Sequence, residues 1–165
     1  ADFGTYFHKA IEEVFDGKPP PEDLIPFIKP VLNWKSEKNL DFIEREKVMV
    51  STKYGFAGTI DIVAQSPKGV KMICDYKTKK THPKYPITAF KEQILQVAAY
   101  AILYWGETAV QNKEVYGANL FVSSTEPGRF EVVGYKPDQI LEAWETFKAI
   151  CVVWRKIKDF DPRIL

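Results

Sequence analysis

The stretch between residues 42 and 78 constrains the fold more than any other part of this sequence. It holds three consecutive segments rich in β-branched and apolar residues, FIEREKVMVST, GFAGTIDIVAQ and GVKMICDYKT, each bounded by Gly, Ser, Pro or Lys. This composition between turn residues is typical of β-strands. The residues SPKG, which separate the second and third segments, are a tight-turn signal. We therefore expect three strands in a row, of which the second and third form an antiparallel hairpin.

Helices are predicted ahead of this block. Thr5 can cap a helix, because apolar residues recur after it at helical spacing, namely Phe7, Ile11, Val14 and Phe15. Residues 22–39 contain Pro26 and Pro30, and proline removes a helical hydrogen bond. We therefore expect short helical pieces there, with a Lys-rich end.

The second half of the chain alternates helix and strand signals. Residues 87–105 are rich in Ala, Leu, Gln and Glu and are followed by Gly106, which predicts a long helix with a stop. Residues 114–124 and 128–135 resemble two further strands, and residues 137–158 a closing amphipathic helix that starts with Pro and Asp. The order of helix, three strands, helix, strands and helix predicts an α/β fold.

Length and composition indicate one globular domain over residues 1–165. Apolar residues make up 45% and charged residues 27%, near the average of soluble proteins, and no apolar run is long enough for a membrane span. The formal net charge of +1 predicts no partner, so attraction to a polyanion must come from local patches. Two cysteines and no secretory signal favour an intracellular, reducing location, which would be the cytoplasm in a prokaryote or for a phage protein and is otherwise open.

Two carboxylates and a lysine lie where the hairpin is expected. Asp75 and Lys77 are two apart on one strand and share a face, with Tyr76 turned away, and Asp61 lies on the neighbouring strand. Paired carboxylates repel each other, and a divalent cation relieves that repulsion while gaining the oxygen ligands that Mg²⁺ prefers. Phosphodiester hydrolysis needs such a metal and a second cation, and Lys77 fits the second role.

The same residues have a plainer interpretation, because Asp and Lys two apart are common on solvated strand faces. The position of Asp75 favours function, since an apolar segment leads into it and burial of its carboxylate would be costly without a partner. Asp61 is expected to end a similar strand. Gly58 leaves room where a substrate backbone could approach. The residues alone leave both interpretations open.

Four further residues are candidates with equally plain alternatives. Gln96 and Tyr100 are four apart on the long helix, so they share a face that could meet the charged site or form an ordinary boundary. His8 borders the apolar stripe of the first helix and could bind metal or only pack. Glu46, on the first expected strand, could support the metal or lie on a solvated face.

A basic stretch follows the third expected strand. Its members could form an electrostatic funnel with stacking surfaces for single-stranded nucleic acid, or a solvated loop. They are Lys77, Lys79, Lys80, His82 and Lys84, together with Tyr76 and Tyr85.

In series, His8 in GTYFH, Asp61 in GTID, Asp75 to Lys77 in DYKT, and Gln96 to Tyr100 in QVAAY resemble the RecB-like branch of the PD-(D/E)XK nucleases. The strand pair GANLFV and FEVVGY before a long helix is also similar to the mitochondrial genome maintenance exonuclease group and its bacterial and phage relatives. Each motif is weak alone, but their order is specific. The resemblance implies a restriction-endonuclease-like core, with a mixed β-sheet flanked by helices.

The resemblance also implies roles for these residues. Mg²⁺ or Mn²⁺ would be bound by His8, Asp61, Asp75 and the backbone carbonyl of Tyr76, with Lys77 as the catalytic lysine. Glu46 would support the metal centre. Gln96 and Tyr100 would line the path of the DNA. Lys79 and Lys80 are expected to contact DNA as members of the basic stretch, not because of the resemblance.

Two positions depart from the pattern of the family. The proline expected before the first aspartate is Ile60, a common change in this branch. Members with an iron-sulfur cluster need four cysteines, and Cys74 and Cys151 cannot supply them, so a cluster is excluded.

Three functions are compatible with these expectations. The leading one is an exonuclease that acts on single-stranded DNA ends. An endonuclease of the same chemistry and a catalytically inactive DNA-binding module are the alternatives, and the complete set of Asp61, Asp75 and Lys77 disfavours the inactive module.

Overall fold

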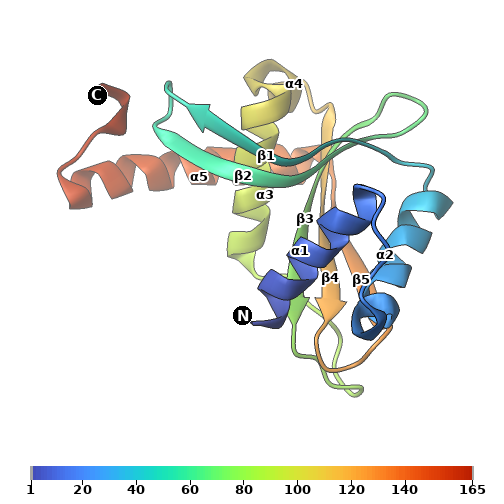
Figure 1. Cartoon of the computed structure of the whole chain (residues 1–165). Helices are drawn as coiled ribbons and strands as arrows, with labels where there is room; N and C mark the ends of the chain where they lie inside the picture. Colours follow the sequence, from blue (N-terminus) through green and yellow to red (C-terminus); the bar gives the residue numbers. More distant parts are fainter. Residues whose placement is uncertain (1, 165) are drawn as a thin grey trace.

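A five-stranded mixed β-sheet forms the centre of the protein, and the computed structural model describes residues 2–164 of the chain (Figure 1). The strands lie in sequence order, β1-β2-β3-β4-β5. Only β3 and β4 pair in parallel, and the other neighbours are antiparallel. Their bounds are β1 Asp41–Ser51, β2 Phe56–Gln65, β3 Lys71–Lys79, β4 Val115–Ser123 and β5 Phe130–Tyr135. The α/β class and the mixed sheet expected from the sequence are confirmed.

The turn at SPKG closes the predicted hairpin. Gly69 has a φ of +80°, a conformation that glycine adopts without a steric penalty. Its N–H donates to the carbonyl of Ser66 at 2.9 Å. The pairing of Gln65 with Lys71 then sets the antiparallel register of β2 and β3. The predicted hairpin is therefore confirmed.

Two helices cover each face of the sheet. On one face α1 (Phe3–Phe15) and α2 (Ile25–Glu37) bury Phe7 and Ile28 against the sheet, and on the other α3 (Lys91–Trp105) and α5 (Pro137–Lys158) bury Val97 and Trp144. The short α4 (Glu107–Gln111) follows α3, and the 3-10 turns η1 (Glu22–Leu24) and η2 (Pro162–Ile164) complete the elements. Within residues 2–164, no helix combines the length and hydropathy needed to cross a membrane.

Two details of the first helices differ from the sequence-based expectation. Asp2, not Thr5, caps α1, because its carboxylate accepts the backbone N–H of Thr5 at 2.8 Å. The helix thus begins at Phe3, whereas a cap at Thr5 would place its first residue at Tyr6. Residues 25–37 form one continuous helix rather than short pieces, although Pro30 lies inside it. Burial of Ile28 and Val31 accompanies this continuity and outweighs the single hydrogen bond that Pro30 removes.

The sheet divides into two diverging parts at its centre. The pairing of β2 with β3 reaches from Gln65 back to Ile62, opposite Cys74, and stops there. Beyond that point β2 remains paired with β1, and β3 with β4, so that the long β1–β2 ribbon crosses the other strands at an angle (Figure 1). Asp61 and Asp75 are the next residues on the two strands. They therefore lie within their strands, not at the strand ends as expected, but at the end of the shared pairing.

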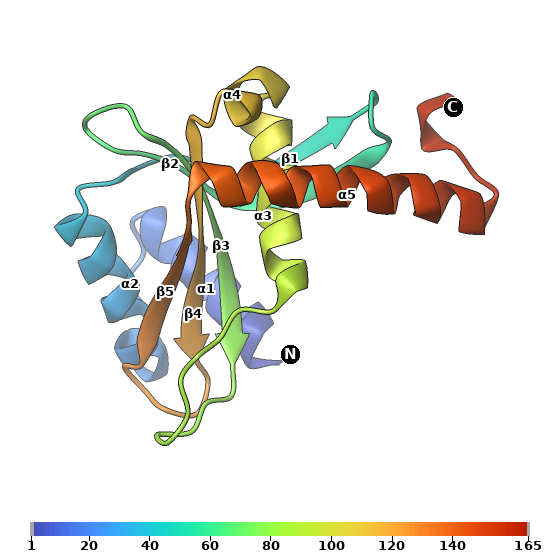
Figure 2. The same cartoon turned by 180° about the vertical axis from the view of Figure 1, so that it is seen from behind.

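The last helix extends past the sheet. Figure 2 shows the C-terminal part of α5 projecting beyond the strands, on the same side as the tip of the β1–β2 hairpin. The guanidinium of Arg155 donates to the carbonyl of Tyr54 at 3.2 Å, which ties the helix to that tip. The C-terminal part of α5 is therefore in contact with the tip of the hairpin.

Candidate active site

Asp61 lies directly beyond the last pair of β2 with β3, at the point that we call the fork of the sheet. Its carboxylate is buried. Its Oδ2 accepts the backbone N–H of Tyr76 at 2.8 Å, in place of a ladder partner. Its Oδ1 lies 3.9 Å from Nδ1 of His8. Burial, together with the negative charge of Asp75, raises the pKa of Asp61 well above its ordinary value. The ionised form of Asp61 is therefore unfavourable unless a cation lies close to it.

Three residues from three different elements converge beside this carboxylate. His8 of α1, Glu46 of β1 and Asp61 of β2 each offer a ligand atom, and these atoms lie within 4.8 Å of one another. Glu46 has a φ of +46°, an uncommon conformation for a non-glycine residue inside a strand. Burial lowers the pKa of His8, which favours the neutral imidazole that binds metals. The cluster brings Glu46 among the possible metal ligands rather than behind them.

Asp75 is held differently. Its Oδ2 contacts Nζ of Lys77 at 2.6 Å and accepts from Nδ2 of Asn119 at 3.2 Å. The shared face predicted for Asp75 and Lys77 is confirmed. Because both donors meet the same oxygen, Oδ1 is available to a cation. Asp75 is outside the three-residue cluster of His8, Glu46 and Asp61.

A chain of hydrogen bonds runs from Lys77 to the long helix α3. Nζ of Lys77 donates to Oε1 of Gln96 at 2.8 Å, and Nε2 of Gln96 donates to the hydroxyl of Tyr100 at 2.9 Å. The two half-buried helix residues thus share a face that meets the charged site, and their expected role in binding DNA stays a prediction. The space above Gly58 is not open to substrate as expected, because a Cβ there would lie 2.6 Å from the ring of Tyr100.

A second buried pair, Asn119 and Tyr135, was not predicted from the sequence. The Tyr135 hydroxyl donates to Oδ1 of Asn119 at 2.5 Å, which turns the Asn119 amide group toward Asp75. Burial, with the charge of Asp75, raises the pKa of Tyr135 to about 12, so its hydroxyl remains a donor at neutral pH. The available signal was a single Asn within the mainly apolar run VYGANLFV, since a buried amide requires partners.

Glu12 is another residue near the site that sequence reasoning missed. It follows His8 by one helical turn and pairs with the guanidinium of Arg45 at 2.7 Å. Burial raises the pKa of Glu12 to about 7. Within residues 2–164 its Oε1 is buried without a hydrogen-bond partner. The spacing of four from His8 on a helix was the sequence signal.

The basic stretch after β3 is only partly a surface for nucleic acid. Tyr76 is 2% exposed and packs edge-on against the ring of His8, so the expectation that it offers a stacking surface is wrong. Nζ of Lys79 donates to the carbonyl of Thr88 and lies 4.6 Å from the ring centre of Phe90. Lys80 is exposed, and so are His82, Lys84 and Tyr85 of the following loop. The loop therefore exposes two lysine side chains and the rings of His82 and Tyr85 to solvent.

The donor set fits a hard divalent cation. Carboxylate oxygens and a neutral imidazole are ligands for Mg²⁺ or Mn²⁺. The carboxylate of Asp61 is buried with no cationic side chain at hydrogen-bond distance among the described residues. Burial of such a group is unfavourable unless a charge compensates it. The point where β2 and β3 separate, with possible ligands from α1, β1 and β2 beside a lysine, is therefore a candidate site for a divalent metal ion.

The sequence model of the PD-(D/E)XK nuclease superfamily matches residues 29–163. The chain belongs to this superfamily, whose members hydrolyse nucleic acids with divalent metal ions. The protein is accordingly a hydrolase of nucleic acids. The matched stretch contains Glu46, Asp61, Asp75 and Lys77, whereas His8 precedes it.

The crystal structure of SSO0001 is one of the solved structures similar to this chain. The two are 16% identical with a TM-score of 0.37, and the alignment covers 89% of this chain and 67% of SSO0001. No curated protein matches the chain in sequence.

Proposed function

We propose that the protein is a DNA exonuclease of the RecB-like branch that degrades single-stranded ends with Mg²⁺ or Mn²⁺. The observation that carries the proposal is the arrangement of Asp61, Asp75 and Lys77 at the fork, with Nζ of Lys77 at 2.6 Å from Asp75. His8, Asp61, Asp75 and the carbonyl of Tyr76 hold the metal ion in this proposal. The assignment to the RecB-like branch rests on the order of the motifs, and the similarity to the mitochondrial genome maintenance exonuclease group rests on the strand pair GANLFV and FEVVGY before the long final helix.

Glu46 supports the metal centre in this proposal, and it can reach the ion directly from its place beside His8 and Asp61. When bound, the divalent ion neutralises phosphate charge and lowers the pKa of a water molecule. The residues of the chain supply position and charge. Asp75 fixes the ammonium group of Lys77, and Gln96 fixes it from the other side at 2.8 Å. An ammonium held at two points costs no reorganisation when charge builds on the phosphate.

Features on the α3 side of the site support a single-stranded substrate. The cations of Lys79 and Lys80 lead away from Lys77 along the end of β3. Tyr85 is 68% and Phe90 is 60% exposed, which gives flat surfaces for unpaired bases. Cations beside exposed aromatic rings are the usual composition of single-strand binding surfaces. Gln96 and Tyr100 continue this surface along the helix.

The first experiment measures degradation of end-labelled single-stranded DNA by the purified protein. We expect degradation with Mg²⁺ or Mn²⁺ that EDTA stops, and loss of degradation in Asp75→Ala and Lys77→Ala. Matched single-stranded RNA tests the preference for DNA. If both variants degrade DNA as fast as the parent protein, the proposed site is wrong.

Circular single-stranded DNA separates an exonuclease from an endonuclease. An exonuclease leaves the circle intact and digests the same molecule after linearisation. Cleavage of the circle would replace the proposal by an endonuclease of the same chemistry. Salt-dependent DNA binding without cleavage in any divalent metal would instead identify an inactive binding module.

A further inference from the structure

An apolar groove leads from the candidate active site to the far end of α5. It consists of two adjoining hollows, of about 330 and about 270 Å³. The inner hollow is lined by residues of β2, α3 and α5, and Gln96 and Tyr100 are among them. Phe56, Phe147 and Ile150 line both hollows, so the two form one continuous groove.

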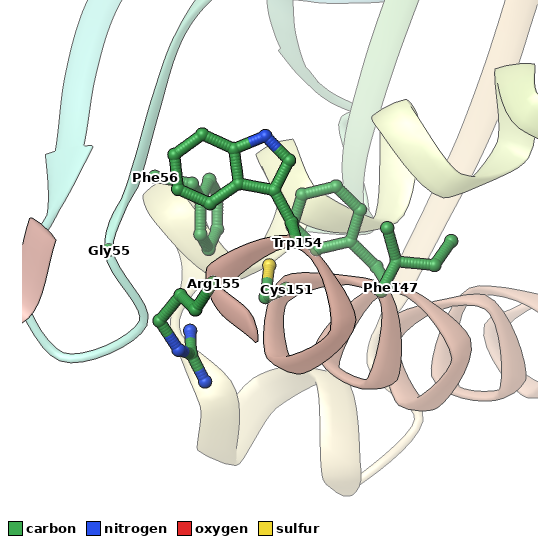
Figure 3. Close-up of a pocket in the computed structure, with 7 residues that line it drawn as sticks. Gly55, Phe56, Phe147, Cys151, Trp154 and Arg155 are labelled. Atoms are coloured by element: carbon green, nitrogen blue, oxygen red, sulfur yellow. The ribbon is translucent and has the colours of Figure 1, made fainter. Parts of the chain in front are cut away.

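Aromatic side chains dominate the outer hollow. Figure 3 shows Phe56, Phe147 and Trp154 grouped around it, with Cys151 on the helix between them. Trp154 is 43% exposed, so its ring is accessible to a ligand. Arg155 marks the outer end of the groove. Flat apolar rings without a fixed set of hydrogen-bond donors suit ligands with π-faces.

One face of α5 forms the floor of the outer hollow. The lining residues on this helix follow the spacing i, i+3, i+4, i+7 and i+8, which normally marks a face packed on a core. Here the helix extends past the sheet (Figure 2), and Ile150 remains 46% exposed. This face of α5 therefore has the residue spacing of a surface that packs on a core. Within residues 2–164, however, no other element covers it completely.

We propose that this groove binds the unpaired bases of a single-stranded polynucleotide next to the phosphate at the active site. The inference rests on the proposed function. Its strongest support is continuity, since Gln96 and Tyr100 line the inner hollow and Nζ of Lys77 donates to Gln96 at 2.8 Å. A strand with a phosphate at Lys77 has its neighbouring bases at the entrance of the groove.

The chemistry of the groove selects single strands over duplexes. The faces of the bases in a duplex are hidden in the stack, whereas unpaired bases can stack on aromatic side chains. Stacking is tolerant of sequence because every base has a π-face. Arg155, Lys156 and Lys158 in the last turn of α5 supply positive charge for the backbone beyond the hollow. Glu92, the acidic member of the lining, belongs to the inner hollow.

The outer wall of the groove is fixed before any ligand binds. The guanidinium of Arg155 holds the carbonyl of Tyr54 at the hairpin tip. The neighbouring Gly55 has a φ of +73°, and a Cβ there would lie 2.7 Å from Pro162, so η2 packs closely on the same tip. A wall held at two points reduces the conformational entropy lost on binding.

The test compares Trp154→Ala and Trp154→Phe with Val153→Ala, a change of an exposed apolar residue on the same helix outside the groove. The substrates are a thymidine oligonucleotide of about 20 residues, long enough for a site of several stacked bases, and a thymidine dinucleotide. In Trp154→Ala we expect the ratio of kcat/KM for the oligonucleotide to that for the dinucleotide to fall about 5- to 100-fold, the loss of one stacked base. Trp154→Phe should restore most of the ratio, and Val153→Ala should leave it unchanged.

Binding is measured separately by fluorescence anisotropy of the labelled oligonucleotide with metal-free protein. Trp154→Ala should weaken binding by a similar factor, and a duplex should not compete. If Trp154→Ala changes neither the ratio of kcat/KM values nor the affinity for the oligonucleotide, the groove does not bind bases and the proposal is wrong. This result is expected if a protein segment occupies the groove instead. If the parent protein binds through Trp154 but cleaves neither substrate in any divalent metal, the groove stands and the proposed hydrolysis fails.

Discussion

The two carboxylates of the candidate site have contrasting surroundings. Asp61 lies beside Glu46 and His8, which offer possible ligands for a metal ion, and its Oδ2 accepts a backbone N–H. Asp75 instead receives an ammonium from Lys77 and an amide from Asn119 on one oxygen. Among residues 2–164, no cationic side chain lies at hydrogen-bond distance from the carboxylate of Asp61, whereas the carboxylate of Asp75 contacts the ammonium group of Lys77.

The contrast separates two functions within one site. The surroundings of Asp61 disfavour an ionised carboxylate until a cation binds, so in our proposal the affinity for metal depends mainly on this side. Lys77 already compensates the charge of Asp75, so in our proposal this side also positions the lysine for catalysis. Variants on the two sides should therefore differ in metal binding, stability and pH dependence as well as in activity.

The largest expected effect is on turnover. Lys77→Met should lower kcat for single-stranded DNA by about 10²- to 10³-fold, because a preorganised cation is lost from the transition state. Its binding of Mn²⁺ should change little, whereas Asp61→Asn should lose both turnover and Mn²⁺ binding. Turnover is measured with labelled DNA, and metal binding by titration calorimetry. Equal loss of Mn²⁺ binding in the two variants would remove the distinction between the two sides.

A smaller effect is expected for the pair behind Asp75. Asn119→Leu should lower metal affinity or activity by about 10- to 100-fold, as is common for residues that orient a metal ligand. Tyr135→Phe, which removes only the hydroxyl that turns the Asn119 amide, should have a milder effect in the same direction. The Mn²⁺ concentration for half-maximal activity is the readout, since a purely structural role would not move it. Parent-like Mn²⁺ dependence in both variants would show that Asp75 needs no positioning.

The two carboxylates should have opposite effects on stability when metal is absent. With EDTA at mildly alkaline pH, Asp61→Asn should raise the free energy of unfolding by about 1 kcal/mol or more, the equivalent of one unit of raised pKa. Asp75→Asn should lower it by about 1–3 kcal/mol, because it removes the charge from a hydrogen-bonded pair with Lys77. Urea denaturation measures both values. Destabilisation in both variants would contradict the interpretation of Asp61.

The smallest expected effect is a pH dependence that belongs to Asp61. Since burial raises the pKa of Asp61, the metal-free folded state binds its proton more tightly than the unfolded state. Stability from this group is therefore complete below the ordinary aspartate pKa of about 4 and is lost as the pH rises through the raised pKa. Mn²⁺ should stabilise the protein more as the pH rises through this window. Thermal melting of the parent protein and Asp61→Asn, with and without Mn²⁺, isolates the effect, and identical pH profiles of the two would exclude it.

Much of the fold could be predicted because its signals are local. The SPKG turn, the long helix stopped by Gly106 and the start of α5 at Pro137 all follow from residues within a few positions of each element. The predictions that were wrong concern segments in which a local sequence preference opposes burial in the folded protein. Pro30 predicts a break, but burial of its helix neighbours keeps α2 continuous.

Predictability of the site follows the same division. The pairing of Asp75 with Lys77 depends on the two-residue period of a strand, and the shared face of Gln96 and Tyr100 on the period of a helix. Neither period indicates that Asn119 would reach Asp75 from a strand that follows 44 residues later. The occupation of the space above Gly58 by Tyr100 likewise depends on how α3 crosses β2.

The sequence by itself determined the order of the elements, the α/β class and the residue types that can bind a divalent cation. Those properties depend on backbone periodicity and side-chain chemistry, which are set by residues close to one another in the sequence. Only the tertiary structure decided where the sheet forks, and therefore that Asp61 faces His8 and Glu46 while Asp75 is held by Lys77. That decision depends on strand pairing and helix packing between residues far apart in the chain, which no local pattern specifies.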